Sequence, residues 1–599
     1  MSNNSRNPIA LFRGALLLAA VAACAVDPEI SEIDLAGSAS GHRAVVAFRT
    51  LVITGTGTGS RLALRLRTSA VLEVDVGDDG SAEFSFDRSR FDRVIIYAGG
   101  GDDIVRMDEA LGAFTNEEEI TIIGGPGNDT LLGGIGDENL FGGPGNDTVD
   151  GGRGLDTVFL GEGNDTFLWD PGDGNDLVEG EDGTDVLVFN GSGANEAIDL
   201  SADGNRLRLF RDVAAVTMDL DGIERVDVHA RAGADSVMVG DLTGTSVAEV
   251  NIDLAAFAGS EAGDALADVV VVNGAAGPDT IIVAADGGAV VAAGMAAKVS
   301  VTNGEPALDR LVVNTDEGDR VHVNGSAAAD TMLLIDGPDA PLVQVTGFNV
   351  TVAASGEGLL AVNGLGGDDT IQALAPVTTP LHLDGGEGND VVLGGFGPDV
   401  LLGGPGDDTV DGGRGVDTVF LGEGNDTFVW DPGDGNDVVE GEDGTDVLVF
   451  NGSGANEAID LGANGSRLRL FRDVAAVTMD LDGIERVDVH ARAGADSVMV
   501  GDLTGTSAAQ VNIDLAAFTG SEAGDAQLDV IGVLGSASAD VIGIAADAGA
   551  VVVSGLAAAV RITHPEVSDQ LTVNGLGGVD TITPGPGVEG LLQLIVNQD

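Results

Sequence analysis

The stretch from Gly124 to Leu168 reads GGPGNDTLL, GGIGDENLF, GGPGNDTVD, GGRGLDTVF and LGEGNDTFL, one nine-residue pattern repeated five times without a gap. Glycine permits positive φ and close approach of the backbone, so the first six residues of each copy can turn tightly with their carbonyl groups gathered at one point. The last three residues form a short strand. Each nonapeptide therefore predicts half a turn of a coil.

Nonapeptides that are two apart stack in a column, and their loops can surround a cation with carbonyl and carboxylate oxygens. Hard oxygen ligands without His or Cys favour Ca²⁺ over a transition metal. A flexible cage of six or more oxygens favours Ca²⁺ over Mg²⁺. The aspartate at the sixth position is the expected side-chain ligand.

The same set of turns occurs twice. After an insertion, Trp169-Asp170, two looser turns follow at 171–179 and 180–188. At an offset of 261 residues, 142–264 recurs as 403–525 without a gap and with ten differences, so the second block, 385–449, has the same seven turns. Both copies should fold alike and do the same thing.

The candidate calcium ligands are the sixth-position aspartates of the two blocks: Asp129, Asp147, Asp156, Asp165, Asp176, Asp185, Asp390, Asp399, Asp408, Asp417, Asp426, Asp437 and Asp446. The second nonapeptide of the first block has Asp137 and then Glu138 at this place, so its site is expected to be weak or empty. Counting the loop pairs predicts roughly eight to ten Ca²⁺ in all.

Gly, Asn and Asp are also the commonest turn formers, so a lone match would indicate only a turn before a strand. Five contiguous copies in each of two blocks favour calcium instead.

These residues resemble the hemolysin-type calcium-binding repeat family over Gly124–Val188 and Gly385–Val449. The resemblance implies a parallel β-roll with calcium between its loops. The segment from Trp169 to about Phe257 is similar to an extension that follows the repeats in many predicted bacterial surface proteins. Family members exported by the type I route have a carboxy-terminal signal, whereas this chain has a candidate amino-terminal one, so that route is not assumed.

The remaining sequence predicts further β structure, as in the alternating stretches Leu62–Leu66 and Val71–Val76. The expected fold class is all-β, with two parallel β-roll blocks joined and flanked by β-rich solenoid-like or sandwich-like segments. The expected segments are a lipoprotein-type export signal (1–23), an N-terminal β-rich region (24–123), β-roll 1 (124–188), extension 1 (189–268), a connecting region (269–384), β-roll 2 (385–449), extension 2 (450–529) and a C-terminal β-rich region (530–599).

Three degenerate turns outside the blocks keep Asp at the sixth position: Asp279, Asp369 and Asp580. They have no partner two turns away in the nonapeptide pattern. They are therefore expected to be strand turns without calcium, because the cage would be incomplete.

The charge balance narrows the range of partners. The chain has 27 Lys and Arg against 98 Asp and Glu, a formal charge of −71, and its single lysine is Lys298. Nucleic-acid binding needs stripes of basic residues, so it is excluded, and anionic membrane surfaces are disfavoured.

The amino terminus has the layout of an export signal, with Arg6 and Arg13 before an apolar run from Gly14 to Ala23. Its end, Val21-Ala22-Ala23-Cys24, resembles the bacterial lipobox, in which the cysteine is acylated. The alternative is ordinary cleavage after Ala22 or Ala25. Both interpretations place the protein outside the cytoplasm, extracellular or anchored at the outer membrane through Cys24.

No His-Glu-x-x-His helix, Gly-x-Ser-x-Gly elbow or Asp-Pro-His motif is present in the sequence. The first hypothesis is accordingly a non-enzymatic, exported calcium-binding structural or surface protein. The second is an adhesin or carbohydrate-binding surface protein that calcium stiffens, with a cell-surface or glycan partner. The third is a hydrolase of unfamiliar type, located in Arg43–Ile123 or Val269–Asp384.

Overall fold

The computed structural model describes residues 34–598 except 40, 338, 339 and 375, and within these ranges the chain is almost entirely β. The helical segments of the described residues are four single 3₁₀ turns. No described helix is long and apolar enough to span a membrane. The chain divides into two compact units. The first comprises the chain up to Val188 together with the later segment 217–223, and the second comprises 189–216 and the chain from Glu224 onward.

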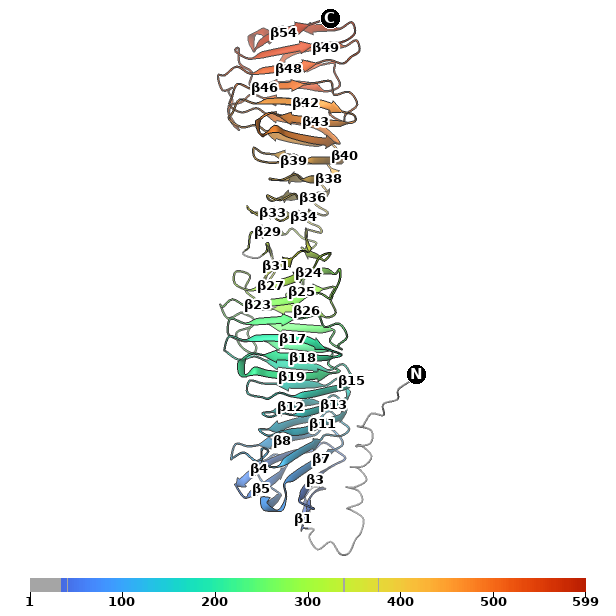
Figure 1. Cartoon of the computed structure of the whole chain (residues 1–599), viewed down its shortest axis with the longest axis vertical. Coiled ribbons are helices and arrows are strands. Elements are labelled where there is room, and N and C mark those ends of the chain that lie inside the picture. The colour runs from blue at the N-terminus through green and yellow to red at the C-terminus, as the bar shows by residue number, and fades with distance from the viewer. Residues whose placement is uncertain (1–33, 40, 338–339, 375, 599) are drawn as a thin grey trace, which may run out of the picture. The chain divides into compact units, whose positions relative to one another are not determined.

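The first unit is a coil of two parallel sheets (Figure 1). Leu140 pairs with Val158, and Leu131 pairs with Val149, so strands two nonapeptides apart are hydrogen-bonded neighbours. One sheet contains β3 (Thr50–Thr56), β7 (Arg93–Gly99), β9 (Glu119–Ile123), β11 (Glu138–Pro144), β13 (Thr157–Gly163) and β15 (Leu177–Gly183). The other contains β8 (Ile104–Asp108), β10 (Thr130–Gly134), β12 (Thr148–Gly152) and β14 (Thr166–Trp169).

The strands are longer than the three residues that the nonapeptide suggests. β11 and β13 each have seven residues, because pairing continues into the first glycines of the next turn. At its start, the unit has antiparallel strands, with β4 (Arg61–Thr68) paired to β5 (Val71–Val76), where the sequence alternates in strand fashion.

The core of each half-coil is only one or two side chains wide. Leu131, Val149 and Phe167 are 0% exposed on one sheet, and Leu140 and Val158 are 0% exposed on the other. Such a thin interior is filled mainly by branched aliphatic residues, with a few buried rings such as Phe167, so a folded chain of this length needs few aromatic residues.

The second unit contains a β-roll between wider coils. Its repeat strands are β33 (Thr370–Ala373), β35 (Val391–Leu393), β37 (Thr409–Asp411), β39 (Thr427–Trp430) and β41 (Asp446–Asn451) in one sheet, and β34 (Leu381–Asp384), β36 (Val400–Pro405), β38 (Thr418–Gly424) and β40 (Val438–Gly444) in the other. These parallel blocks confirm the predicted all-β class and β-rolls. The boundaries of the eight expected segments remain predictions.

In the wider coils, antiparallel hairpins extend the path between parallel strands. Examples are β17 (Ala197–Asp203) with β18 (Arg206–Arg211), and β24 (Thr280–Asp286) with β25 (Ala289–Ala293). A turn of the coil then takes about twice as many residues as in the repeats, while the parallel pairing of the core strands is kept.

The duplication continues in the backbone beyond Asp525. β23 (Val269–Asn273) and β24 correspond to β48 (Val530–Leu534) and β49 (Val541–Asp547), which begin 261 residues later. The same offset relates β25 and β26 (Lys298–Thr302) to β50 (Ala550–Ser554) and β51 (Ala559–Thr563). The two copies therefore share strand positions where their sequences have diverged.

Replacing Gly406 by Ala should destabilise the second β-roll. Gly406 has φ +147°, and a Cβ there would lie 1.6 Å from the Gly388 carbonyl oxygen of the neighbouring coil. We expect a loss of at least ~2 kcal/mol in the free energy of unfolding, measured by denaturant titration in saturating calcium. Gly454→Ala is the control, since nothing lies within 4 Å of its Cβ position. Equal effects at both glycines would contradict the close stacking of loops.

Candidate metal centres

The predicted aspartates of the first block form ladders that run from coil to coil. The Asp129 N–H donates to Asp147 Oδ1 at 2.7 Å, Asp147 N–H to Asp165 Oδ1 at 2.6 Å, and Asp165 N–H to Asp185 Oδ1 at 2.9 Å. On the other edge, Asp156 N–H donates to Asp176 Oδ1 at 3.0 Å. The structure thus brings all six predicted residues of this block into two columns.

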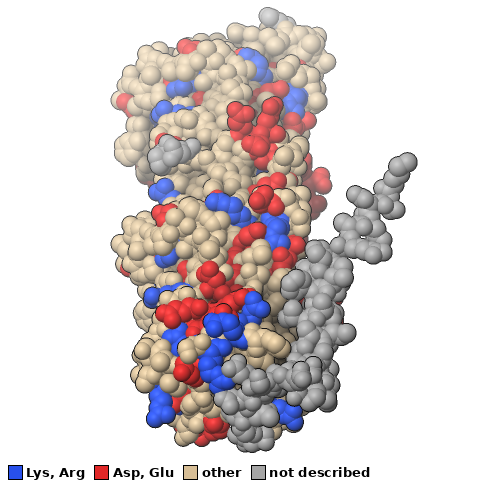
Figure 2. Space-filling view, turned by 60° about the horizontal axis from the view of Figure 1, so that its bottom comes forward, with Lys and Arg blue, Asp and Glu red and all other residues tan. Residues whose placement is uncertain are grey.

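The second block repeats this arrangement. One column runs Asp390, Asp408, Asp426, Asp446, with N–H to Oδ1 distances of 2.7, 2.8 and 2.9 Å. The other runs Asp399, Asp417, Asp437, with distances of 2.8 and 3.0 Å. All thirteen predicted aspartates are between 0% and 3% exposed. Figure 2 displays acidic and scattered basic side chains at the surface, whereas these column aspartates are buried.

The second carboxylate oxygen is the unusual feature of the columns. Oδ2 is buried and accepts no hydrogen bond in Asp129, Asp147, Asp156, Asp165, Asp176, Asp390, Asp408, Asp417, Asp426, Asp437 and Asp446. A buried acceptor without a donor is costly, and more so when it carries charge. These oxygens need either a proton or a cation.

At Gly142 and Gly403, the first glycines of two such loops, a carbonyl oxygen of the next stacked loop lies close to that Oδ2. A Cβ at Gly142 would lie 2.4 Å from Asp147 Oδ2 and 2.4 Å from the Leu160 carbonyl oxygen. At Gly403 the corresponding distances are 2.6 Å to Asp408 Oδ2 and 2.3 Å to the Leu421 oxygen. Only glycine leaves this space open, and oxygens from two stacked loops converge on it.

Burial raises the pKa of Asp147, Asp156, Asp408 and Asp417, and neighbouring carboxylates raise it further. The pKa is about 7 for Asp147 and Asp408, about 8 for Asp417 and about 9 for Asp156. Within the described part of the second block, no Arg, Lys or His forms an ion pair with a column aspartate. The protein supplies no counter-charge of its own there.

These residues fit a hard dication. Adjacent strands lie about 4.8 Å apart, and a Ca²⁺–oxygen bond is roughly 2.3–2.6 Å, so such an ion can be shared by oxygens of successive coils. Among the described residues, no group of three or more His, Cys, Asp or Glu side chains is placed to hold a metal. The cage must therefore combine aspartate oxygens with backbone carbonyls, which is a donor set that calcium accepts.

A family model for the RTX calcium-binding nonapeptide repeat matches residues 121–149, 132–167, 172–192, 382–401, 393–428 and 433–454. The chain carries RTX calcium-binding repeats. Calcium is accordingly their ligand, as the oxygen-only pattern predicts, and several ions are bound. No curated protein sequence matches the chain.

The expectation that Asp279, Asp369 and Asp580 lie in solitary turns is wrong. Asp279 N–H donates to Asp319 Oδ1 at 2.9 Å, Asp369 N–H to Asp390 Oδ1 at 2.7 Å, and Asp580 Oδ1 accepts from Asp540 N–H at 2.9 Å. Each turn does precede a strand, as expected, but it is stacked on another acidic turn. Hairpin insertions separate Asp279 from Asp319 and Asp540 from Asp580, and Asp369 lies 21 rather than 18 residues before Asp390, so a nine-residue pattern did not find these partners.

Two residues of the RTX columns are bound differently from the others. Glu138 takes the place of aspartate, since its N–H donates to Asp156 Oδ1 at 2.7 Å and its Oε2 accepts from Gly134 N–H at 2.8 Å. Asp399 is bound in the same way, with Oδ2 accepting from Gly395 N–H at 2.7 Å. Both belong to the second loop of a block, and both turn one oxygen back onto their own loop.

One further acidic residue precedes the first block. Asp103 is 1% exposed, and its N–H donates to Asp129 Oδ1 at 2.8 Å. The signal that could have found it is Gly99-Gly100-Gly101-Asp102-Asp103, which keeps the glycines and the aspartate of the pattern. Cys24 and the export segment lie outside the described residues.

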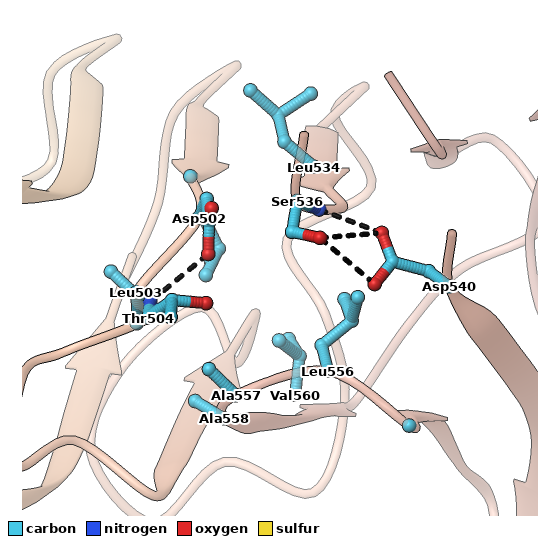
Figure 3. A pocket seen from close by; sticks show the side chains of 13 residues that line it. Asp502, Leu503, Thr504, Leu534, Ser536, Asp540, Leu556, Ala557, Ala558 and Val560 are labelled. Atoms are coloured by element: carbon cyan, nitrogen blue, oxygen red, sulfur yellow. Dashed lines mark hydrogen bonds between the residues drawn. The ribbon is translucent and has the colours of Figure 1, made fainter. Parts of the chain in front are cut away.

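A cavity of about 290 Å³ lies beside Leu503, Leu534 and Leu556, with Asp540 and Ser536 at its side (Figure 3). The Asp540 carboxylate accepts from the Ser536 amide and hydroxyl at 2.7 and 3.1 Å, so it is already satisfied. No His, Lys or Arg lines the cavity to activate a hydroxyl. In the first copy, Asn273 and Met295 replace Leu534 and Leu556, and only about 10 Å³ remains.

Replacing Asp408 by Asn separates a metal ligand from a turn former, because Asn suits a tight turn but removes the charge. We expect one or two fewer bound Ca²⁺ per chain and a folding midpoint at higher calcium, measured by equilibrium dialysis and circular dichroism. Asp502→Asn is the control, because exposed Asp502 only accepts from Thr504 N–H at 3.0 Å. Equal responses would mean that the columns need aspartate only for turns.

The metal-free protein should be more stable in mild acid. Unfolded aspartates ionise near pH 4, whereas folded, metal-free Asp408 keeps its proton up to a pKa of about 7. This contribution to stability is fully present below about pH 4 and is lost as pH rises through about 7. In chelator, β structure measured by circular dichroism should therefore persist at pH 5 and decline towards pH 8. With calcium, the apparent affinity should weaken as pH falls below 7. Chelated protein that is more stable at pH 8 than at pH 5 would contradict the raised pKa values.

Proposed function

We propose that the protein is an exported structural protein of the cell surface, without catalytic activity, whose two β-rolls are ordered by calcium. The observation that carries the proposal is the column of buried carboxylate oxygens that have no hydrogen-bond donor. A catalytic metal needs an open coordination position for substrate. The column aspartates are at most 3% exposed, which supports a structural metal.

An extracellular location supports the same proposal. Extracellular calcium modules bind with Kd values of roughly 10⁻⁴–10⁻³ M, so repeats of this kind suit a compartment rich in calcium. The apolar run that ends at Cys24 provides the route out of the cytoplasm and a candidate lipid anchor. The chain has no second cysteine, so packing and metal must stabilise it.

A calcium-stiffened adhesin is the second candidate. Phe257 and Phe518 occupy the same position in the two copies, and each is 65% exposed. A matched pair of exposed aromatic rings is a plausible contact for a glycan or protein ligand. Glycan-array and cell binding by the mature protein, together with a screen of hydrolase substrates, distinguishes the structural, adhesive and enzymatic candidates. Specific binding that is lost in Phe257→Ser/Phe518→Ser would favour the adhesin.

The anchor proposal predicts an acylated Cys24 as the first residue of the mature protein. Cys24→Ser should move the protein from the membrane fraction to the medium or leave it unprocessed, as followed by fractionation and by mass spectrometry of the mature amino terminus. An unacylated chain beginning at Ala23 or Val26 would contradict the anchor and leave ordinary secretion.

A further inference from the structure

The cavity beside Leu534 is a feature that the two copies of the duplication do not share. Thirteen residues line it, and at ten of these positions the first copy has the same residue. The volume nevertheless falls from about 290 Å³ in the second copy to about 10 Å³ in the first. A few side chains therefore decide whether the coil is hollow here. The three positions that differ are Leu534, Ser536 and Leu556, which correspond to Asn273, Ala275 and Met295.

In the first copy, hydrogen bonds hold the Asn273 side chain against the neighbouring strands. Its Nδ2 donates to the Val239 carbonyl oxygen at 3.4 Å, and its Oδ1 accepts from Asn314 Nδ2 at 2.8 Å. Leu534 has no polar group that could make these contacts. At the other position, the flexible methionine of the first copy fills an irregular gap better than the branched leucine of the second. These two exchanges account for the open space in the second copy.

The cavity has an apolar wall. Val560 is 0% exposed, Leu503 2% and Ala558 4%, and Leu534 and Leu556 are half-buried. Figure 3 shows Leu556, Ala558 and Val560 along one side of the space. Water finds few hydrogen-bond partners on such a surface, so an alkyl chain that displaces this water gains free energy. The volume is just below the usual range of ligand pockets, roughly 300–1,000 Å³, so the apolar group that fits is small.

The polar side chains beside this wall are acidic or carry a hydroxyl group. In Figure 3, Asp502 and Thr504 lie on one side of the space, and Ser536 and Asp540 lie on the other. None of the described residues that line the cavity is Lys, Arg or His. The two carboxylates would repel an anionic head group and attract an ammonium group, and they could accept a hydrogen bond from a hydroxyl group. The lining therefore selects against anions.

We propose that this cavity binds the alkyl chain of a small amphiphile whose head group is uncharged or positively charged. The chain occupies the apolar space beside Leu503 and Leu556, and the head group lies near Asp502 and Asp540. The first copy has no such site, because its corresponding space is filled. The duplication has thus left one copy with a binding site that goes beyond the proposed structural function.

The test measures binding of octyltrimethylammonium, octyl glucoside and octanoate to the mature chain in saturating calcium, by isothermal titration calorimetry below the concentrations at which they form micelles. One molecule of the ammonium or glucoside probe should bind per chain, and octanoate should bind at least about tenfold more weakly. Leu534→Asn/Leu556→Met gives the second copy the residues of the first, and it should abolish binding. Leu528→Asn is the matched control, because this leucine is 51% exposed and does not line the cavity.

The reverse exchange tests for a gain of binding. Asn273→Leu/Met295→Leu should open the first copy and raise the stoichiometry to two molecules per chain. A wild-type chain that binds neither the ammonium nor the glucoside probe would overturn the proposal. A folded Leu534→Asn/Leu556→Met variant that binds as tightly as the wild type would do the same. If circular dichroism shows that this variant does not fold, an unchanged stoichiometry in the reverse exchange is the overturning result.

Discussion

A buried aspartate oxygen with no hydrogen-bond donor, repeated in successive coils, is the constraint on which this structure depends. In each ladder, Oδ1 is satisfied by the amide of the aspartate in the preceding coil, as between Asp147 and Asp129. Oδ2 of most of these residues has no such partner. Stacking the coils at strand spacing brings these carboxylates together, so the packing that buries the core also concentrates negative charge. Bound calcium would neutralise this charge, and on that ground we propose that metal binding and folding are coupled.

The glycines and the thin core follow from the same geometry. Backbone approaches backbone so closely at Gly142 and Gly406 that no side chain fits, and each repeat strand turns only one or two side chains into the interior between the sheets. Hydrophobic burial per residue is modest in such a coil, so the ladders and their cations contribute a large share of its cohesion. The long hairpins outside the repeats add strands without changing the parallel pairing of the core strands.

Much of the repeat region could be predicted from the sequence, because the turn-forming glycines, the candidate aspartate ligand and the strand residues all recur within the same nine residues. The stacking of alternate loops and the thirteen aspartates were found in this way. Asp369 was missed as a column member because it lies 21 rather than 18 residues before Asp390, and because 39 residues with a hairpin separate it from Asp330. Asp399 accepts from Gly395 N–H at Oδ2 and from Leu381 N–H of the preceding coil at Oδ1, at 2.7 and 2.8 Å, and no local pattern reports the second donor. A pattern of fixed period therefore predicts contacts between regular repeats, but not contacts between turns that are separated by insertions of variable length.

Calcium dependence of the fold is tested most directly by far-ultraviolet circular dichroism of the mature chain at pH 8, in EDTA and then in millimolar calcium. Ionised, uncompensated columns should leave the repeat coils without stable β structure in EDTA, and calcium should restore it cooperatively. If calcium orders the rolls, adding it should give a large, reversible gain of β signal. A spectrum that is the same in EDTA and in calcium would contradict it.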